Sequence, residues 1–328
     1  MVFLFKDKSI GSIFFLVALC CAVHAHLFIH PPVIAITEDS GIISYTLEHY
    51  FTNAFPSLAT CLYIAIVLIQ AIRLNLLLND LRMYSTAGFT TALTYVLLTA
   101  ILPQWSYISP ALIANSFVIW IFIFLSRLYN NPNPRSLLFN TGLVVGISFL
   151  CYHPTAILIA VVLFALAVVR PFILSEWFVL LLGILMPIYV FLSLLFLNDN
   201  MPIFVTMLPH LSLHLPVGHT DVWVWVKLMT MVLMLFVGLQ YWSVQNNRMV
   251  IQIRKNWSAM LVMLVIILPI PFIFKGVGLD SAILCLVPLA SFIGNAYLYP
   301  KKMLLPNIMF WLCIVLVIHT NWVMGVGN

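Results

Sequence analysis

The chain has 328 residues, of which 64% are hydrophobic and only 7% are charged. Soluble domains carry about 25% charged residues, so this chain has too few charged groups to cover a water-exposed surface. The composition excludes a soluble enzyme, a disordered chain, a nucleic-acid binder and a disulfide-stabilised scaffold. It predicts an all-α polytopic transmembrane bundle, with one integral membrane domain over residues 1–328 and no soluble domain.

Hydrophobic stretches recur along the whole chain, and about eleven of them are predicted to be membrane spans. A hydrocarbon core about 30 Å thick needs roughly 20 residues per helix, with some tolerance for tilt and thinning. The predicted spans are residues 11–30, 56–78, 87–103, 110–127, 138–151, 155–170, 177–197, 222–243, 257–274, 281–299 and 303–322. Only Tyr152, His153 and Pro154 separate the fifth span from the sixth. These two spans therefore form either a hairpin or one long helix kinked at the proline.

Lys and Arg residues decide between these alternatives, because they mark the cytoplasmic side of membrane proteins. With a cytoplasmic N-terminus and eleven crossings, all but two of the 14 Lys and Arg fall on the cytoplasmic side. The twelve are Lys6, Lys8, Arg73, Arg82, Arg127, Arg135, Arg170, Arg248, Arg254, Lys255, Lys301 and Lys302. Merging the fifth and sixth spans would destroy this separation. We therefore predict the hairpin, an external C-terminus, and a positive charge that reflects topology rather than a polyanion-binding face.

The N-terminal segment has a second interpretation. Its basic start, its apolar run and Val23-His24-Ala25 resemble a secretory signal with a small-residue cleavage site. The cleavage pattern is weak, which favours an uncleaved first span. The six cysteines lie within or at the ends of spans and include no C-x-x-C, so they are interpreted as apolar core residues.

The first external loop, residues 31–55, contains the candidate catalytic residues Glu38 and Asp39. It also carries Glu48 and His49 but no Lys or Arg. A carboxylate beside a lipid surface can act as a general base, or it can bind a divalent cation that bridges phosphates. The alternative is a solvated turn, because a Glu-Asp pair is common in sequences.

The second external loop, residues 198–221, contains His210, His214, His219 and Asp221. Imidazole and carboxylate groups at this density can bind zinc or copper, and His210 and His214 can neutralise a phosphate. Their spacing matches no established ligand motif. The alternating leucines of this loop also fit an interfacial hairpin, and the sequence identifies no cofactor.

Lys227 lies within the eighth span, where an ionisable group is costly and therefore informative. Its long side chain can reach the external interface past Trp223 and Trp225, which is the favoured interpretation. Alternatively, it faces the bundle interior and binds an anionic headgroup. Asn115 and Asn140 are expected to form hydrogen bonds between helices.

Two stretches, residues 87–131 and 140–197, resemble a family of multi-pass inner-membrane proteins of Bacteroidota defined by a domain of unknown function. The most specific parts of this resemblance are Ser109-Pro110-Ala111-Leu112-Ile113-Ala114-Asn115 and Arg170-Pro171-Phe172 with Glu176-Trp177. The resemblance implies the cytoplasmic membrane of a Gram-negative bacterium and no particular activity.

The same region is more distantly similar to the membrane half of the GT-C glycosyltransferases. The similarity lies in residues 142–146, in His153-Pro154-Thr155-Ala156, and in the acidic first external loop. It implies a polyprenyl-phosphate sugar donor and a catalytic carboxylate at Glu38 or Asp39. The chain departs from that family in its short first loop and in lacking a recognisable second carboxylate motif.

Three functions follow as alternatives. The first is a GT-C-like transfer of a sugar from a lipid phosphate on the periplasmic side, with Glu38 or Asp39 as base or metal ligand. The second is a non-catalytic subunit or scaffold that contacts other envelope proteins, and the third is a lipid or small-solute transporter. An outward-facing cavity would favour the transferase, a filled bundle the scaffold, and a polar path at mid-membrane the transporter.

Overall fold

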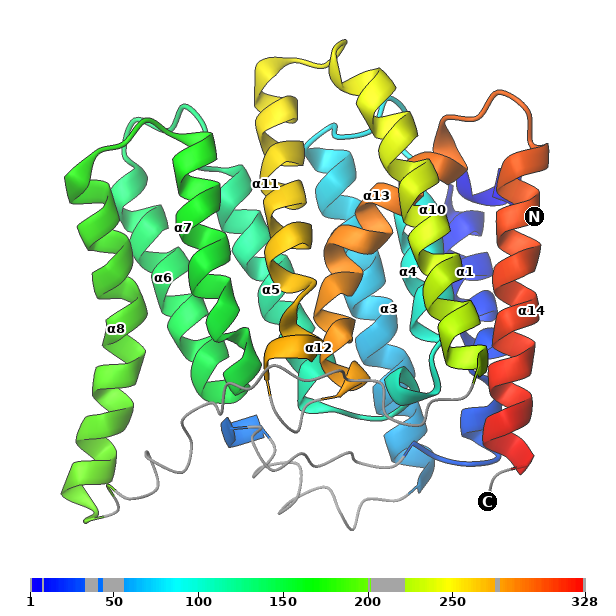
Figure 1. The fold of residues 1–328 in the computed structure, drawn as a ribbon, viewed down its shortest axis with the longest axis horizontal. Helices are drawn as coiled ribbons and strands as arrows, with labels where there is room; N and C mark the ends of the chain where they lie inside the picture. The colour runs from blue at the N-terminus through cyan, green and yellow to red at the C-terminus, as the bar shows by residue number, and fades with distance from the viewer. Residues whose placement is uncertain are drawn as a thin grey trace.

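The structure is a computed structural model that describes residues 2–7, 9–32, 41–43, 56–199, 201, 222–274 and 278–326. In these residues the chain is a bundle of helices without β-strands (Figure 1). A helix lies in each of the eleven predicted spans, which confirms the all-α class. The helices are α1 (Ile10–Val23), α3 (Pro56–Asp80), α4 (Thr90–Thr99), α5 (Pro110–Ser126), α6 (Pro134–Cys151), α7 (Ile157–Val169), α8 (Leu174–Leu197), α10 (Val222–Asn246), α11 (Ile251–Ile267), α13 (Leu286–Leu298) and α14 (Leu304–Val326).

Short helical pieces connect these helices. They are η1 (Val2–Phe5), η2 (Ala25–Phe28), η3 (Pro103–Ser106), η4 (His153–Ala156), α12 (Ile270–Ile273) and η5 (Leu279–Cys285).

Within the described residues, seven helical segments are long and apolar enough to cross a membrane. They are Ser57–Asp80, Pro134–Cys151, Leu174–Leu197, Val222–Asn246, Ile251–Ile273, Leu279–Leu298 and Leu304–Val323. The other four predicted spans contain shorter apolar helices, and α4 is the shortest of them with 10 residues. The long apolar helices indicate a membrane-embedded protein, as the composition predicts.

The start of α5 shows how the sequence specifies a helix boundary. The Ser109 side chain caps the helix by accepting a hydrogen bond from the Leu112 backbone N–H at 3.2 Å. Pro110 occupies the first helical position, where its missing N–H costs nothing. This accounts physically for the Ser-Pro of the Ser109–Asn115 motif.

The fifth and sixth predicted spans, α6 and α7, are two antiparallel helices. Tyr152 is extended and ends α6, and Pro154 follows in the first turn of η4. The Arg170 side chain, just after α7, donates hydrogen bonds to the carbonyl oxygens of Leu128 and Asn131, just before α6. The chain therefore returns to the level at which α6 began, and the single kinked helix is wrong.

The basic residues gather at one end of the bundle. The connections α3–α4, α5–α6, α7–α8, α10–α11 and α13–α14 all lie at the upper end in Figure 1, and they carry Arg82, Arg127, Arg170, Arg248, Lys301 and Lys302. At this end Lys6 donates to the Leu298 carbonyl at 3.0 Å, and its partial burial lowers the pKa of its ammonium. The lower end, called the acidic end below, carries Asp199 and Asp280 among the described residues.

The centre of the bundle is formed by α4 and α13. Every residue of α4 is buried, and 94% of the apolar window in Leu279–Leu298 is buried. Gly238 of α10 lets that helix approach α13, since a Cβ there would clash with the Phe292 carbonyl oxygen.

Glycines also hold α6 against α8, a helix with only 17% of its apolar window buried. A Cβ on Gly142 would lie 2.5 Å from the Leu180 carbonyl oxygen, and one on Gly146 would lie 2.5 Å from that of Ile184. Gly183 makes the reciprocal approach, since its Cβ would lie 2.5 Å from the Phe139 carbonyl oxygen. Small residues of this kind let membrane helices pack closely through backbone contact.

Replacement of Gly142 by Ala is expected to destabilise the protein by about 1–3 kcal/mol, because the backbone of α8 must move away. The measurement is thermal unfolding of the purified protein in detergent. Gly11→Ala is the matched control, because its nearest contact would be an ordinary 3.7 Å from the Ser9 Oγ. Equal stability of the two variants would contradict the glycine packing.

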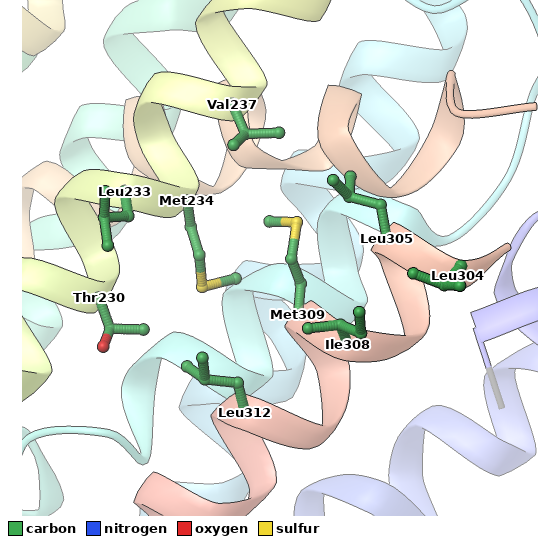
Figure 2. A pocket seen from close by; sticks show the side chains of 9 residues that line it. All are labelled: Thr230, Leu233, Met234, Val237, Leu304, Leu305, Ile308, Met309 and Leu312. Carbon is green, nitrogen blue, oxygen red and sulfur yellow. The ribbon is translucent and has the colours of Figure 1, made fainter. Parts of the chain in front are cut away.

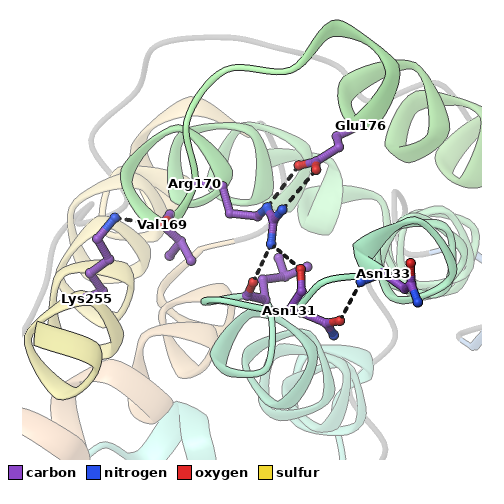
Figure 3. Close-up of polar contacts among 7 residues, drawn as sticks. Asn131, Asn133, Val169, Arg170, Glu176 and Lys255 are labelled. Atoms are coloured by element: carbon purple, nitrogen blue, oxygen red, sulfur yellow. Dashed lines mark hydrogen bonds and ion pairs between the residues drawn. The ribbon is translucent and has the colours of Figure 1, made fainter.

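The connection between α7 and α8 is held by Arg170, shown with its partners in Figure 3. Its guanidinium forms a bidentate pair with Glu176 at 3.0 Å for each contact. The same group binds the carbonyl oxygens of Leu128 and Asn131 at 2.9 and 3.0 Å, and Lys255 of α11 donates to the Val169 carbonyl at 2.8 Å. Arg170 and Glu176 of the family-like motif thus join the connections before α6 and after α7.

Arg170→Lys is expected to lower stability by about 2–3 kcal/mol, because an ammonium cannot replace the planar fork that satisfies four acceptors. Thermal unfolding in detergent measures this. Arg135→Lys, at an exposed position in the first turn of α6, is the matched control and should change little. An Arg170→Lys protein as stable as the control would show that the pair is only a surface contact.

Candidate functional site

An apolar groove of about 250 Å³ lies between α10, the α11–α12 region and the η5–α13 region. Its lining residues are Trp105, Trp225, Leu228, Met231, Val232, Leu235, Leu268, Pro271, Phe272, Leu279, Ala282, Cys285 and Leu289. The lining therefore consists of apolar and aromatic side chains. A groove of this kind suits a hydrocarbon chain better than a polar solute.

Proline shapes one wall of this groove. Pro269 and Pro271 interrupt the helix after Ile267, so α11 ends there and the short α12 follows. Proline removes a backbone donor and prevents a continuous helix. As a result, Leu268, Pro271 and Phe272 turn to one side of the groove instead of continuing a straight helix.

Trp105 closes the groove on the side of η3. It is buried, and its indole N–H donates to the Leu279 carbonyl at 3.1 Å, which ties η3 to η5. Its own carbonyl accepts a hydrogen bond from the Tyr63 hydroxyl at 2.8 Å. One residue therefore joins the apolar groove to a polar region behind it.

The polar region behind Trp105 lies where α1 ends. The buried His24 ring contacts the Cys20 carbonyl oxygen through Nδ1 at 3.1 Å and the Tyr63 hydroxyl through Nε2 at 3.4 Å. Thr60 donates to the Leu27 carbonyl at 2.8 Å. His24 is therefore a buried histidine with both ring nitrogens in contact with polar groups.

His26 differs from His24, because neither of its buried ring nitrogens has a hydrogen-bond partner in the structure. Asn321 of α14 lies beside it and donates to the Val23 carbonyl at 3.0 Å. The side-chain oxygen of Asn321 is likewise buried without a partner. Buried polar atoms of this kind are commonly satisfied by ordered water or by a ligand.

A second apolar groove, of about 190 Å³, lies on the other side of α10 against α14. Figure 2 shows its side chains, with Met234 of α10 and Met309 of α14 both extending into it. Met234 also accepts a contact from the buried Cys313 thiol at 3.5 Å. Apolar grooves therefore lie along two sides of α10.

Lys227 lies on α10 in the buried stripe between the two grooves. Its side chain is only 1% exposed and is among the largest fully buried side chains of the protein. The same stripe also contains Val224, Met231, Met234 and Gly238. The Lys227 side chain is therefore buried within the protein and not exposed at its surface. A buried ammonium requires a partner, and Lys227 is not without one. Its role in binding a phosphate stays a prediction.

The other predicted site residues lie outside the described residues. They are Glu38 and Asp39 of the first loop and His210, His214, His219 and Asp221 of the second. Within the described ranges no three His, Cys, Asp or Glu side chains are grouped as a metal site would need. The catalytic and metal-binding roles of these residues stay predictions.

Asp280 is a carboxylate that the sequence interpretation did not select as a site residue. It follows the groove residue Leu279 in η5, and Tyr152 lies near enough to interact with it electrostatically. The available signal was an acidic residue directly before an apolar span. Hydropathy alone does not show that this position lies beside a groove.

The interior of the bundle also contains a polar cluster of α3, α4 and α5. Gln70 donates to the Leu112 carbonyl and the Ser116 hydroxyl, both at 2.8 Å, and accepts from the Tyr95 hydroxyl at 2.7 Å. Asn115 donates to the Tyr95 hydroxyl at 2.7 Å, which confirms its predicted role between helices, whereas Asn140 is exposed. Three of these four hydrogen bonds join polar side chains of the cluster to one another.

Comparison of the chain with family models, with curated proteins and with solved structures finds no match. Its function must therefore be argued from the grooves, the charge distribution and the residues themselves.

Proposed function

We propose that this is a multi-pass inner-membrane protein that binds a polyprenyl-phosphate-linked sugar at its acidic end and transfers the sugar there, as GT-C transferases do. In this proposal the chain crosses the bilayer eleven times, with the basic end cytoplasmic and the acidic end periplasmic. The observation that carries the proposal is the apolar groove bounded by Trp105, Trp225 and Ala282.

The groove lies where a lipid-linked donor would need it. Its lining from Trp225 to Leu235 begins within the first turn of α10, close to the acidic end of the bundle. A polyprenyl chain would occupy the apolar walls. Its phosphate would lie toward the start of α10, where the backbone N–H groups of the first turn and the positive end of the helix dipole favour an anion.

The buried Lys227 adds a positive charge near the same end of α10. It lies one turn before Met231, a residue of the groove wall. A buried ammonium can hold a phosphate strongly because water does not screen the attraction. Exchanging its present partner for a phosphate would couple donor binding to a local rearrangement.

Glu38 or Asp39 is proposed as the catalytic carboxylate. The base would remove a proton from the acceptor hydroxyl, whose oxygen attacks the anomeric carbon while the bond to the lipid phosphate breaks. Alternatively, the carboxylates would hold a divalent cation that stabilises the departing phosphate. Asp280, beside the groove, is a further carboxylate available at this end.

The rival function is a non-catalytic subunit of an envelope complex. It requires neither the groove nor the carboxylates, so it predicts that changes at both leave the cellular role intact. A transporter would need a polar path at mid-membrane, whereas the interior side chains Gln70, Tyr95 and Asn115 are joined to one another by hydrogen bonds.

Filling the groove is expected to weaken donor binding. Ala282→Trp should reduce the affinity of purified protein for undecaprenyl phosphate by about tenfold or more, because the added ring occupies the space of the lipid chain. Native mass spectrometry or quenching of tryptophan fluorescence measures this binding. Thr230→Trp is the matched control, since it fills the α10–α14 groove instead. If both variants bind as the unchanged protein does, the lipid does not use this groove.

Removal of the two carboxylates is expected to separate binding from transfer. Glu38→Ala combined with Asp39→Ala should leave undecaprenyl phosphate binding within about twofold but abolish transfer, because the base or metal ligand is lost. Complementation of a deletion strain provides the functional measurement, and Glu48→Ala in the same loop is the control. Full complementation by the double variant would rule out catalysis by these carboxylates and favour the scaffold.

A further inference from the structure

A third groove lies in the basic half of the bundle, between α3 and α5. It has a volume of about 210 Å³ and is lined by Ile69, Gln70, Arg73, Ser116, Ile119, Trp120 and Ile123. Unlike the two grooves on α10, it contains a cation.

Arg73 differs from the other arginines of the chain, all of which lie in described ranges. The others lie in connections or in the first turns of helices, whereas Arg73 lies seven residues before the end of α3 at Asp80. Its side chain is exposed, and it forms no ion pair or hydrogen bond with the described part of the chain. It therefore presents a free guanidinium on the outer surface of a membrane-length helix.

The depth of Arg73 suits a lipid phosphate. The 25 residues of α3 extend for about 37 Å, so α3 centred on a hydrocarbon core of about 30 Å projects a few Å beyond it at each end. Seven residues correspond to about 10 Å, which places the Arg73 backbone roughly 7 Å inside that core. An arginine side chain spans such a distance, so its guanidinium reaches the phosphate level of the leaflet at the basic end.

The rest of the groove suits an acyl chain. Ile69 and Trp120 are 67% and 52% exposed, so apolar surface faces outward on both sides of it. Its floor is held in place, because Gln70 donates to the Leu112 carbonyl and the Ser116 hydroxyl, each at 2.8 Å. These bonds tie α3 to α5 and keep the groove open in one shape.

We infer that this groove is a binding site for an anionic phospholipid of the leaflet at the basic end. The lipid phosphate accepts hydrogen bonds from the Arg73 guanidinium, whose planar fork matches two phosphate oxygens. One acyl chain lies along Ile69, Ile119 and Trp120. The inference does not depend on the proposed transferase function, because it concerns the other end of the bundle and different helices.

A lipid fits this groove better than an acidic protein segment does. The surface around Arg73 is apolar at the depth of the hydrocarbon core, where a protein carboxylate would itself be costly to place. A phospholipid brings its negative charge to this level without that cost, and its chains match the groove walls.

The test is native mass spectrometry of the full chain with dioleoyl phosphatidylglycerol or dioleoyl phosphatidylcholine, which have the same acyl chains. The unchanged protein is expected to retain phosphatidylglycerol about fivefold better, as one surface cation attracts an anionic lipid to that extent. Arg73→Gln should abolish this preference, and Arg73→Lys should retain part of it. Arg248→Gln, an exposed arginine in the α10–α11 connection, is the matched control and should keep the full preference.

Further measurements separate the possible outcomes. Inorganic phosphate alone should not compete, because the acyl chain supplies much of the binding. Thermal unfolding in phosphatidylcholine checks that Arg73→Gln still folds. An unchanged lipid preference in a folded Arg73→Gln protein would overturn the inference, as would a change in oligomeric state without a change in lipid preference.

Discussion

The structure depends on one constraint, which is that apolar surface faces lipid while many polar groups inside the bundle form hydrogen bonds with other protein groups. Seven percent charged residues cannot cover this chain in water, yet α8 leaves most of its apolar residues exposed. Within the bundle, by contrast, Gln70, Tyr95 and Asn115 form a connected set of hydrogen bonds. A bilayer satisfies both requirements, because it accepts the first surface and cannot solvate the second.

The same constraint explains how far the sequence predicts the fold. Helix positions were predictable, since hydrophobic length marks them, and the break at Tyr152-His153-Pro154 was predictable from proline and from the separation of charges. How deeply each helix is buried in the bundle was not predictable. Leu174–Leu197 is more apolar than Leu279–Leu298, with mean hydropathies of 2.6 and 1.7, yet only 17% of its apolar window is buried against 94%. Lipid and protein interior are equally apolar, so hydropathy does not distinguish them.

The candidate groove was unpredictable for a related reason. Its walls come from η3, α10, α12, η5 and α13, and the Trp105–Leu279 hydrogen bond joins residues 174 positions apart. Nothing in the local sequence of Trp105 indicates that partner. For Lys227, the sequence predicts a position inside a span. It does not predict the direction of the side chain, because that direction depends on how α10 is rotated about its axis. The close approach of Gly238 to Phe292 specifies that rotation and turns Lys227 inward.

The two grooves along α10 have similar walls but differ in what a lipid phosphate would meet. The α10–α14 groove extends along α10 from Thr230 to Val237 and along α14 from its first residue, Leu304, at the basic end. A phosphate at that end would lie near the C-terminal half of α10, where the helix dipole is unfavourable to an anion. The α10–α13 groove begins at Trp225, near the N-terminus of α10, where the dipole and Lys227 both favour an anion. The direction of one helix therefore distinguishes two otherwise similar apolar grooves, and it favours the acidic end for the lipid-phosphate site of the proposed function.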